Sequence, residues 1–253
     1  MIFSKLNLAL LLIISLQLSC SRKVPVLKNN LQTYKSFVKV KNVITIKDCK
    51  EVKNCKPDTF GSVGSGFAIV NVGNNTIFLT AGHVCVHKLP ESFENIIYKT
   101  HMQVETWDKN VREPRISVIP KEYNLGLDLC IMEVENLTIP PIKVSIREPE
   151  FGDRVYSMAA PVGEYFAPYP LMLDGLFSGP AWSYFSRASL PAVGGSSGSP
   201  VMNSNGKLIG LLFAINKDFA HSSLLIRLEH IKKFVATYMI KRKTLLNTRP
   251  KNP

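Results

Sequence analysis

Acidic residues are scarce in this sequence: 19 aspartates and glutamates stand against 31 lysines and arginines, giving a formal net charge of +12 at pH 7. A charge of this sign is typical of proteins that bind polyanions. The lysines between positions 23 and 56 are scattered, however, and no motif for reading RNA accompanies them. We therefore predict a solvated basic surface, suited to anionic lipid or cell wall, and no specific nucleic-acid partner.

Heptads and close internal repeats are also absent, which excludes a long coiled coil and a repeat solenoid. Hydrophobic residues make up 45% of the chain, which excludes a disordered protein. A length of 253 residues is enough to bury a full core, in one domain or in two small ones. The composition therefore indicates a globular protein, and its glycines and prolines favour one rich in strands.

The chain also lacks an apolar run of the roughly 20 residues that a transmembrane helix requires. Residues 6–18 form a shorter run that follows Lys5 and ends at small residues 19–21, which is the pattern of an export signal. A buried N-terminal helix is the alternative. The end of the run also resembles a lipoprotein cleavage site, although Gln17 stands where that pattern prefers leucine. We predict an exported protein that is periplasmic, secreted, or attached to the cell envelope through a lipidated Cys20.

Short β-branched and apolar runs, separated by turn residues, predict that most of the chain is strand. This succession favours a barrel or a sandwich over alternating strands and helices. Helical spacing of apolar residues is convincing only in residues 227–246, which we expect to form a helix on the outside of the fold. A free amphipathic membrane helix is the alternative there. The strand candidates include residues 43–46, 67–72, 76–80, 129–134, 142–146, 154–158 and 207–215.

Residues 194–200, with the sequence Gly-Gly-Ser-Ser-Gly-Ser-Pro, cannot form a regular helix. Such a turn can expose a serine oxygen while neighbouring backbone N–H groups point into one small cavity. Acyl transfer needs this geometry, because those donors must meet the oxyanion as it forms. An ordinary loop is the alternative, so the turn indicates chemistry only if a base and an orienting acid occur elsewhere.

Two residues upstream are candidates for that base and acid. His83 follows an apolar strand and the small-residue bend at 80–82. Asp128 lies inside an apolar segment, where a carboxylate is costly unless it is hydrogen bonded, and an imidazole N–H would satisfy it. The competing acids, Asp153 and Asp174, adjoin glycines and are better explained as turn residues.

His83, Cys85 and His87 also form an H-x-C-x-H pattern that could bind a metal. Val84, however, stands where the H-E-x-x-H type of metalloprotease has its glutamate base. We therefore predict no metal site, and a purely structural histidine is the other alternative at position 83.

Taken together, these motifs resemble those of the trypsin/chymotrypsin-fold serine peptidases of the PA clan, in the same order of histidine, aspartate and serine. The similarity covers about residues 60–235 and is greatest to the compact bacterial branch that includes glutamyl endopeptidases and Htr-type proteases. The matching segments are Gly64-Ser65-Gly66-Phe67, Thr80-Ala81-Gly82-His83, Leu127-Asp128-Leu129, Gly195-Ser196-Ser197-Gly198-Ser199-Pro200 and Gly206-Lys207-Leu208-Ile209-Gly210.

The resemblance implies an all-β fold of two packed six-stranded β-barrels followed by a C-terminal α-helix. With a seam expected near residues 143–151, the predicted parts are an export signal (1–20), a basic tether (21–42), an N-terminal barrel (43–142), a C-terminal barrel with the helix (143–240) and a basic tail (241–253).

The resemblance also implies a serine endopeptidase that cleaves polypeptides through an acyl-enzyme, needs no cofactor and acts as a monomer. His83 would be the general base and then the general acid, Asp128 would orient it, and Ser197 would attack the peptide carbonyl. Backbone N–H groups of Gly195 and Ser197 would form the oxyanion hole. A binding or scaffold protein that kept the fold and lost catalysis is the alternative.

Two positions depart from the family's pattern. Ser196 stands where animal trypsins carry an aspartate that pairs with a freed N-terminus, so activation through that salt bridge is not expected. Leu212 stands where glutamyl endopeptidases place a histidine, so we do not predict acidic specificity. The apolar wall favours an uncharged substrate residue, and the candidate pocket residues are Phe213, Ala214, Ile215 and His221.

Residues 194–198 also satisfy the G-x-S-x-G pattern of esterases, with Ser196 as nucleophile and His221 or His230 downstream. That pattern requires a helix directly after the serine. Pro200 and the turn residues at 203–206 indicate a hairpin instead, which disfavours an esterase.

The five cysteines fit an exported protein. Removal or lipidation of Cys20 leaves Cys49, Cys55, Cys85 and Cys130, enough for two disulfides in an oxidising compartment. Cys49 and Cys55 are close enough for a hairpin bridge, and we pair Cys85 with Cys130 because each lies two residues past a catalytic candidate. The sequence alone allows three pairings, and buried free thiols are the alternative.

Overall fold

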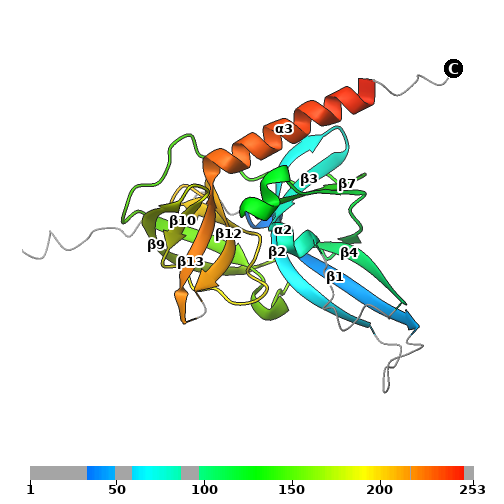
Figure 1. Cartoon of the computed structure of the whole chain (residues 1–253), viewed down its shortest axis with the longest axis horizontal. Helices are drawn as coiled ribbons and strands as arrows, with labels where there is room; N and C mark the ends of the chain where they lie inside the picture. The colour runs from blue at the N-terminus through cyan, green and yellow to red at the C-terminus, as the bar shows by residue number, and fades with distance from the viewer. Residues whose placement is uncertain (1–32, 49–58, 87–96, 217, 248–253) are drawn as a thin grey trace, which may run out of the picture.

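The computed structural model describes residues 33–48, 59–86, 97–216 and 218–247. Two β-sheets lie side by side, and one long helix runs from the second sheet across the first (Figure 1). The predicted all-β class with a C-terminal helix is therefore confirmed. The expected export signal at residues 1–20 lies outside the described residues.

The N-terminal sheet has seven strands in the order β5-β4-β1-β2-β3-β7-β6 and forms a half-barrel. It differs from a closed six-stranded barrel because its edge strands, β5 and β6, are only 2 and 3 residues long and do not pair with each other. Its elements are η1 (Thr33–Ser36), β1 (Phe37–Asp48), β2 (Thr59–Val72), β3 (Asn75–Thr80), α2 (Gly82–Cys85), β4 (Ile97–Thr106), β5 (Val111–Arg112), β6 (Ile116–Val118), η3 (Lys121–Leu125) and β7 (Cys130–Val134).

The C-terminal sheet closes into a six-stranded barrel in the order β10-β13-β12-β11-β8-β9. The strand expected at 142–146 is absent from it. That segment connects the two sheets and makes one parallel bridge, in which Val144 faces Leu208 of β12. The elements are β8 (Arg154–Ala159), η4 (Pro161–Gly163), β9 (Leu171–Trp182), β10 (Phe185–Ala188), β11 (Ser199–Asn203), β12 (Leu208–Asn216) and β13 (Phe219–Arg227), followed by α3 (Leu228–Asn247).

The prediction of a tether over residues 21–42 is wrong for its last part, because β1 begins at Phe37 and is a central strand that pairs with both β2 and β4. Lysines 39 and 41 suggested an exposed segment. Lys39 is in fact buried, and both ammonium groups contact the carboxylate of Glu105 on β4, at 3.0 and 3.1 Å. Pairing across strands thus allows a basic sequence to form the middle of a sheet.

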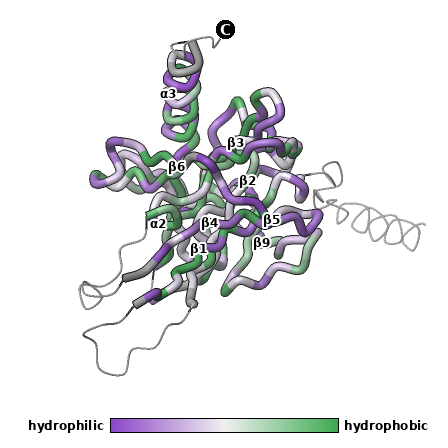
Figure 2. Tube along the Cα trace, turned by 90° about the vertical axis from the view of Figure 1, so that its right-hand side faces the viewer, coloured by the Kyte–Doolittle hydropathy of each residue, from purple (hydrophilic) through white to green (hydrophobic). Residues whose placement is uncertain are grey.

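The helix α3 packs on the fold through one face, as its spacing predicted. Ile231, Phe234 and Tyr238 are buried, and hydrophilic residues alternate with hydrophobic ones along the helix (Figure 2). Within the described residues no helix is both long and apolar enough to cross a membrane. The basic tail predicted from position 241 starts too early, because α3 continues to Asn247 and uses Arg242 as an anchor.

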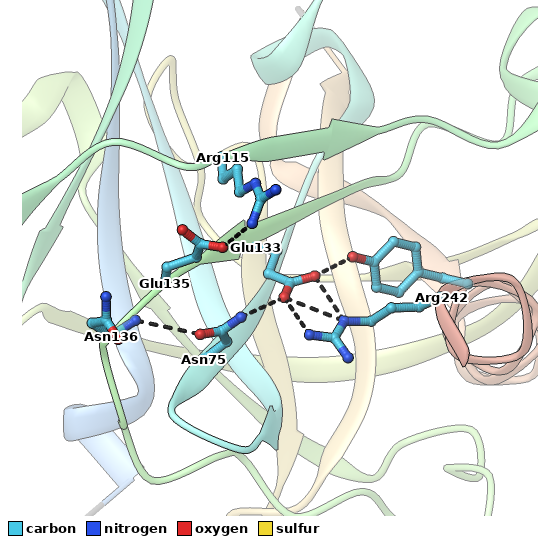
Figure 3. A network of polar contacts seen from close by, with 7 residues as sticks. Asn75, Arg115, Glu133, Glu135, Asn136 and Arg242 are labelled. Atoms are coloured by element: carbon cyan, nitrogen blue, oxygen red, sulfur yellow. Dashed lines mark hydrogen bonds and ion pairs between the residues drawn. The ribbon is translucent and has the colours of Figure 1, made fainter. Parts of the chain in front are cut away.

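That anchor is a buried carboxylate on the first sheet, Glu133 of β7, whose side chain is 4% exposed (Figure 3). Arg242 donates to it from Nη2 at 2.7 Å and from Nε at 3.0 Å, Tyr238 donates from its hydroxyl at 2.5 Å, and Asn75 donates from Nδ2 at 2.8 Å. The hydrogen bonds from Arg242, more than those from Tyr238 and Asn75, lower the pKa of Glu133 to about 2. The network therefore joins α3 to the first sheet.

Replacing Arg242 by methionine should lower the free energy of unfolding by about 3 kcal/mol at pH 7, because it leaves a buried carboxylate without its cation. Urea denaturation of this variant beside Lys243→Met, an exposed neighbour, measures the effect. Since the folded pKa of Glu133 lies below its unfolded value, its stabilisation is present above about pH 5 and disappears as the pH falls toward 2. The difference between wild type and Arg242→Met should therefore shrink in acid, and a difference independent of pH would contradict this assignment.

Candidate active site

His83 and Asp128 meet at the end of the first sheet. The one-turn helix α2 presents His83, and Asp128 lies in the irregular segment just before β7. Asp128 Oδ1 accepts the backbone N–H of His83 at 2.7 Å, and Oδ2 lies 2.6 Å from Nδ1 of the imidazole. Because a carboxylate only accepts, Nδ1 carries the hydrogen. Nε2 is then free to accept a proton, and the histidine side chain is 45% exposed.

Two local features hold this pair. A Cβ at Gly82 would lie 2.5 Å from the ring of Tyr123 and 2.8 Å from Asp128 Oδ1, so the bend before the histidine requires glycine. The disulfide between Cys85 and Cys130, which was predicted, joins α2 to the first residue of β7. It thereby ties the segment with the imidazole to the segment with the carboxylate. Cys49 and Cys55 lie outside the described residues.

The serine turn packs against the same bend. Gly198 has a φ of +91°, and a Cβ there would overlap the carbonyl oxygen of Ser65 and lie 3.0 Å from the backbone nitrogen of Ala81. Ser65 in turn donates its backbone N–H to the carbonyl of Ser197 at 2.8 Å. Contacts between main chains thus bring Ser197 beside the segment that ends in His83.

Ser197 is half-buried, and its hydroxyl donates to the carbonyl of Phe213 at 3.3 Å. Among the described residues, no hydrogen bond joins this hydroxyl to His83. Catalytic hydrogen bonds are often long without substrate and shorten in the complex.

Ser196 is a structural residue. It is fully buried, and its hydroxyl accepts the backbone N–H of Val193 at 3.3 Å. The chain continues from the turn into the strand β11, not into a helix. Both observations argue against the G-x-S-x-G interpretation with Ser196 as nucleophile.

The two N–H groups expected to form an oxyanion hole belong to Gly195 and Ser197. Neither donates to another group in the part of the chain that the structure describes. Gly195 has a φ of +93°, a left-handed conformation that favours glycine, and a Cβ there would overlap the carbonyl of Ala160. The turn therefore leaves two neighbouring donors available to a ligand.

The candidate pocket residues are placed in two groups. Phe213, Ala214 and Ile215 are half-buried in β12, and Phe213 adjoins the serine through its carbonyl. His221 lies exposed on β13, with its ring 5.9 Å from that of Phe219. Among the described residues, no hydrogen bond, ion pair or ring contact joins His221 to the serine turn, so only the apolar residues of β12 lie beside it.

A metal site finds no support in the histidine segment. Cys85 is held in a disulfide, and His87 lies outside the described residues. Among the residues that are described, no three histidine, cysteine or acidic side chains gather as metal ligands would.

The sequence pattern did not indicate a role for Ser65 beyond its place in the Gly64-Ser65-Gly66-Phe67 segment. The structure places Ser65 between the two sheets, in contact with the serine turn. The only signal in the sequence was the presence of this segment ahead of the histidine strand.

Comparison with known proteins agrees with this geometry. The family model of the trypsin-like peptidase domain matches residues 64–211, more than half of the chain. No curated protein sequence matches. The Rv3671c protease from M. tuberculosis in its active form is a similar solved structure, with 17% identity and a TM-score of 0.58, covering 81% of this chain and 81% of that one.

The serine endoprotease from Yersinia pestis is also similar, with 17% identity and a TM-score of 0.60, covering 82% of this chain and 64% of that one. At such identities the structures show a shared fold. The family model reaches further, because it spans the histidine bend, the aspartate and the serine turn. The chain belongs to the trypsin-like peptidase domain family.

Proposed function

We propose that this protein is an exported serine endopeptidase that hydrolyses peptide bonds through His83, Asp128 and Ser197. Family membership supports a serine protease. The observation that carries the finer proposal is the bidentate contact of Asp128 with His83, made beside the turn that carries Ser197. It fixes the imidazole with Nε2 directed away from the carboxylate, as a general base for serine requires.

In the proposed reaction, Ser197 Oγ forms a bond to the substrate carbonyl carbon while its proton moves to Nε2 of His83. Asp128 stabilises the resulting imidazolium, and the N–H groups of Gly195 and Ser197 donate to the oxyanion. Collapse of this intermediate breaks the C–N bond, and His83 gives its proton to the departing amine. An ester on Ser197 remains. Water attacks it with His83 again as base, which releases the acid and restores the hydroxyl.

The proposed substrate class follows from the uncharged side chains of β12 beside the serine turn. Phe213, Ala214 and Ile215 present no charge beside the serine, and Phe185 stacks on Phe213 with ring centroids 4.8 Å apart. Burial of an apolar side chain against these residues is favourable, whereas a charged one would lose its hydration without a partner. We propose cleavage after uncharged residues.

Export remains part of the proposal. The disulfide between Cys85 and Cys130 supports it, because such bonds persist in oxidising compartments. Three further parts of the proposal remain predictions: the export signal at 1–20, the lipidated Cys20 and the monomeric state.

A fluorophosphonate probe tests the proposed activity. The wild-type protein should be labelled on Ser197, as located by mass spectrometry of the labelled peptide, because the probe needs a serine activated by a base. His83→Ala should lose labelling while keeping its melting temperature. An unlabelled, folded wild-type protein would favour the scaffold alternative, and labelling on Ser196 would contradict the assignment of the nucleophile.

A further inference from the structure

Ser65 uses every polar group it has, and it is fully buried. Its backbone N–H donates to the carbonyl of Ser197 at 2.8 Å, and its carbonyl accepts the hydroxyl of Thr80 at 2.7 Å. Its own hydroxyl donates to the carbonyl of Gly195 at 2.8 Å and accepts the backbone N–H of Ala160 at 3.0 Å. One side chain on β2 of the first sheet therefore holds two main-chain groups of the second barrel.

Three consecutive carbonyls of the serine turn, those of Gly194, Gly195 and Ser196, each accept a hydrogen bond. In a trans peptide the N–H points away from the C=O, and the only cis peptide among the described residues precedes Pro168. A partner on one carbonyl therefore also fixes the direction of the next N–H. The Gly194 carbonyl accepts from Val162 at 2.6 Å, that of Gly195 from the Ser65 hydroxyl, and that of Ser196 from the N–H of Ser199 at 3.1 Å.

The hydrogen bonds accepted by the Gly194 and Ser196 carbonyls set the directions of the two N–H groups that would form the oxyanion hole. The Gly194 carbonyl shares its peptide with the N–H of Gly195, and the Ser196 carbonyl shares its peptide with the N–H of Ser197. Because both carbonyls are bound to the protein, both N–H groups are directed away from those partners. The bond from Ser65 to Gly195 fixes the peptide between them, so the relative direction of the two donors depends on it.

The loop at 160–163, whose Val162 N–H donates to the Gly194 carbonyl, is strained. Val162 has φ 47° and ψ 23°, a left-handed conformation that β-branched residues rarely adopt. Its neighbour Ala160 is the group whose N–H the Ser65 hydroxyl accepts, and the carbonyl of Ala160 accepts from Gly163. Ser65 thus restrains the strained loop as well as the turn that the loop supports.

We propose that Ser65 is a positioning residue for the oxyanion site: its hydroxyl, by binding Gly195 and Ala160 together, keeps the N–H groups of Gly195 and Ser197 directed at the substrate. This inference rests on the proposed serine protease function. It deepens that function, because it makes the shape of the oxyanion site depend on a side chain of the first sheet.

The test is Ser65→Ala, assayed with a peptide substrate, with a fluorophosphonate and with a peptide aldehyde. Donors that act in the transition state contribute to kcat and not to ground-state binding, so kcat should fall about 10- to 100-fold while KM changes less than about twofold. The rate of fluorophosphonate labelling and the affinity for the aldehyde should fall by a similar factor. A serine that only supports the fold would change the melting temperature without this division between kcat and KM.

Ser157→Ala is the matched control, because the Ser157 hydroxyl is also buried yet has no hydrogen-bond partner among the described residues. It should keep the wild-type kcat. Should Ser65→Ala fail to fold, Ser65→Cys keeps the volume and weakens the donor, and it should again lower kcat. Ser65→Thr, which keeps the hydroxyl, should restore most of the rate.

The outcomes separate the two proposals. A wild-type protein that does not react at Ser197 overturns the proposed function itself. A reactive wild type with Ser65→Ala or Ser65→Cys equally fast, and folded, overturns the role of Ser65 alone.

Discussion

Replacing Ser197 by alanine should lower kcat for peptide hydrolysis by about 10⁶-fold, the size of effect that loss of the nucleophile has in serine proteases. The methyl group cannot form the acyl-enzyme. The fold should persist, because the Ser197 hydroxyl makes one long hydrogen bond, to the carbonyl of Phe213. Steady-state kinetics on a sensitive fluorogenic peptide, with melting curves of each variant, measure both quantities.

The effect should not add to that of the histidine. His83→Ala alone should cost nearly as much as Ser197→Ala, and the double variant little more, because the two groups act in one step. His101→Ala, a change of the same kind on β4, serves as the control and should leave kcat unaltered. Losses that multiply in the double variant would mean that Ser197 and His83 do not act together.

Asp128→Asn should lower kcat by about 10⁴-fold, because the orientation of the imidazole depends on an acceptor at that position. Asp128 accepts from Nδ1 and from the backbone N–H of His83. An amide has one oxygen, so when that oxygen binds the backbone, its NH₂ faces Nδ1. The imidazole then carries its hydrogen on Nε2, where it cannot take the proton of Ser197.

The matched control for this substitution is Asp174→Asn. Asp174 forms an exposed ion pair with Arg154 on the second barrel, and an asparagine there should leave kcat within about twofold of wild type because such surface pairs contribute little. Both variants should retain the wild-type KM and fold. An active Asp128→Asn enzyme would show that another group orients His83.

The sequence predicted those parts of the fold and site that depend on local pattern. The strands at 67–72 and 76–80, the helix that follows β13 and the paired positions of His83 and Asp128 each follow from short runs of residues. The disulfide could be paired because Cys85 and Cys130 follow two of those positions. Each of these features is encoded within a few neighbouring residues.

The missed features depend on partners far away in the chain. Lys39 appeared exposed because its acceptor, Glu105, lies on a strand that only the fold brings alongside. The Ser65 hydroxyl meets Gly195, which is 130 positions away. A buried lysine in β1 and a serine between two glycines carry no local sign of such partners, so their roles could not be predicted.

The anchor between α3 and the first sheet also has a consequence for folding on the ribosome, because its two halves are synthesised at different times. Arg242 belongs to α3, which is synthesised after both sheets, whereas its carboxylate partner lies on β7, a strand that begins two residues after Asp128. A nascent chain that already contains the histidine, the aspartate and the serine still has an uncompensated carboxylate in that strand. The first sheet therefore gains this stabilising ion pair only after α3 has emerged from the ribosome.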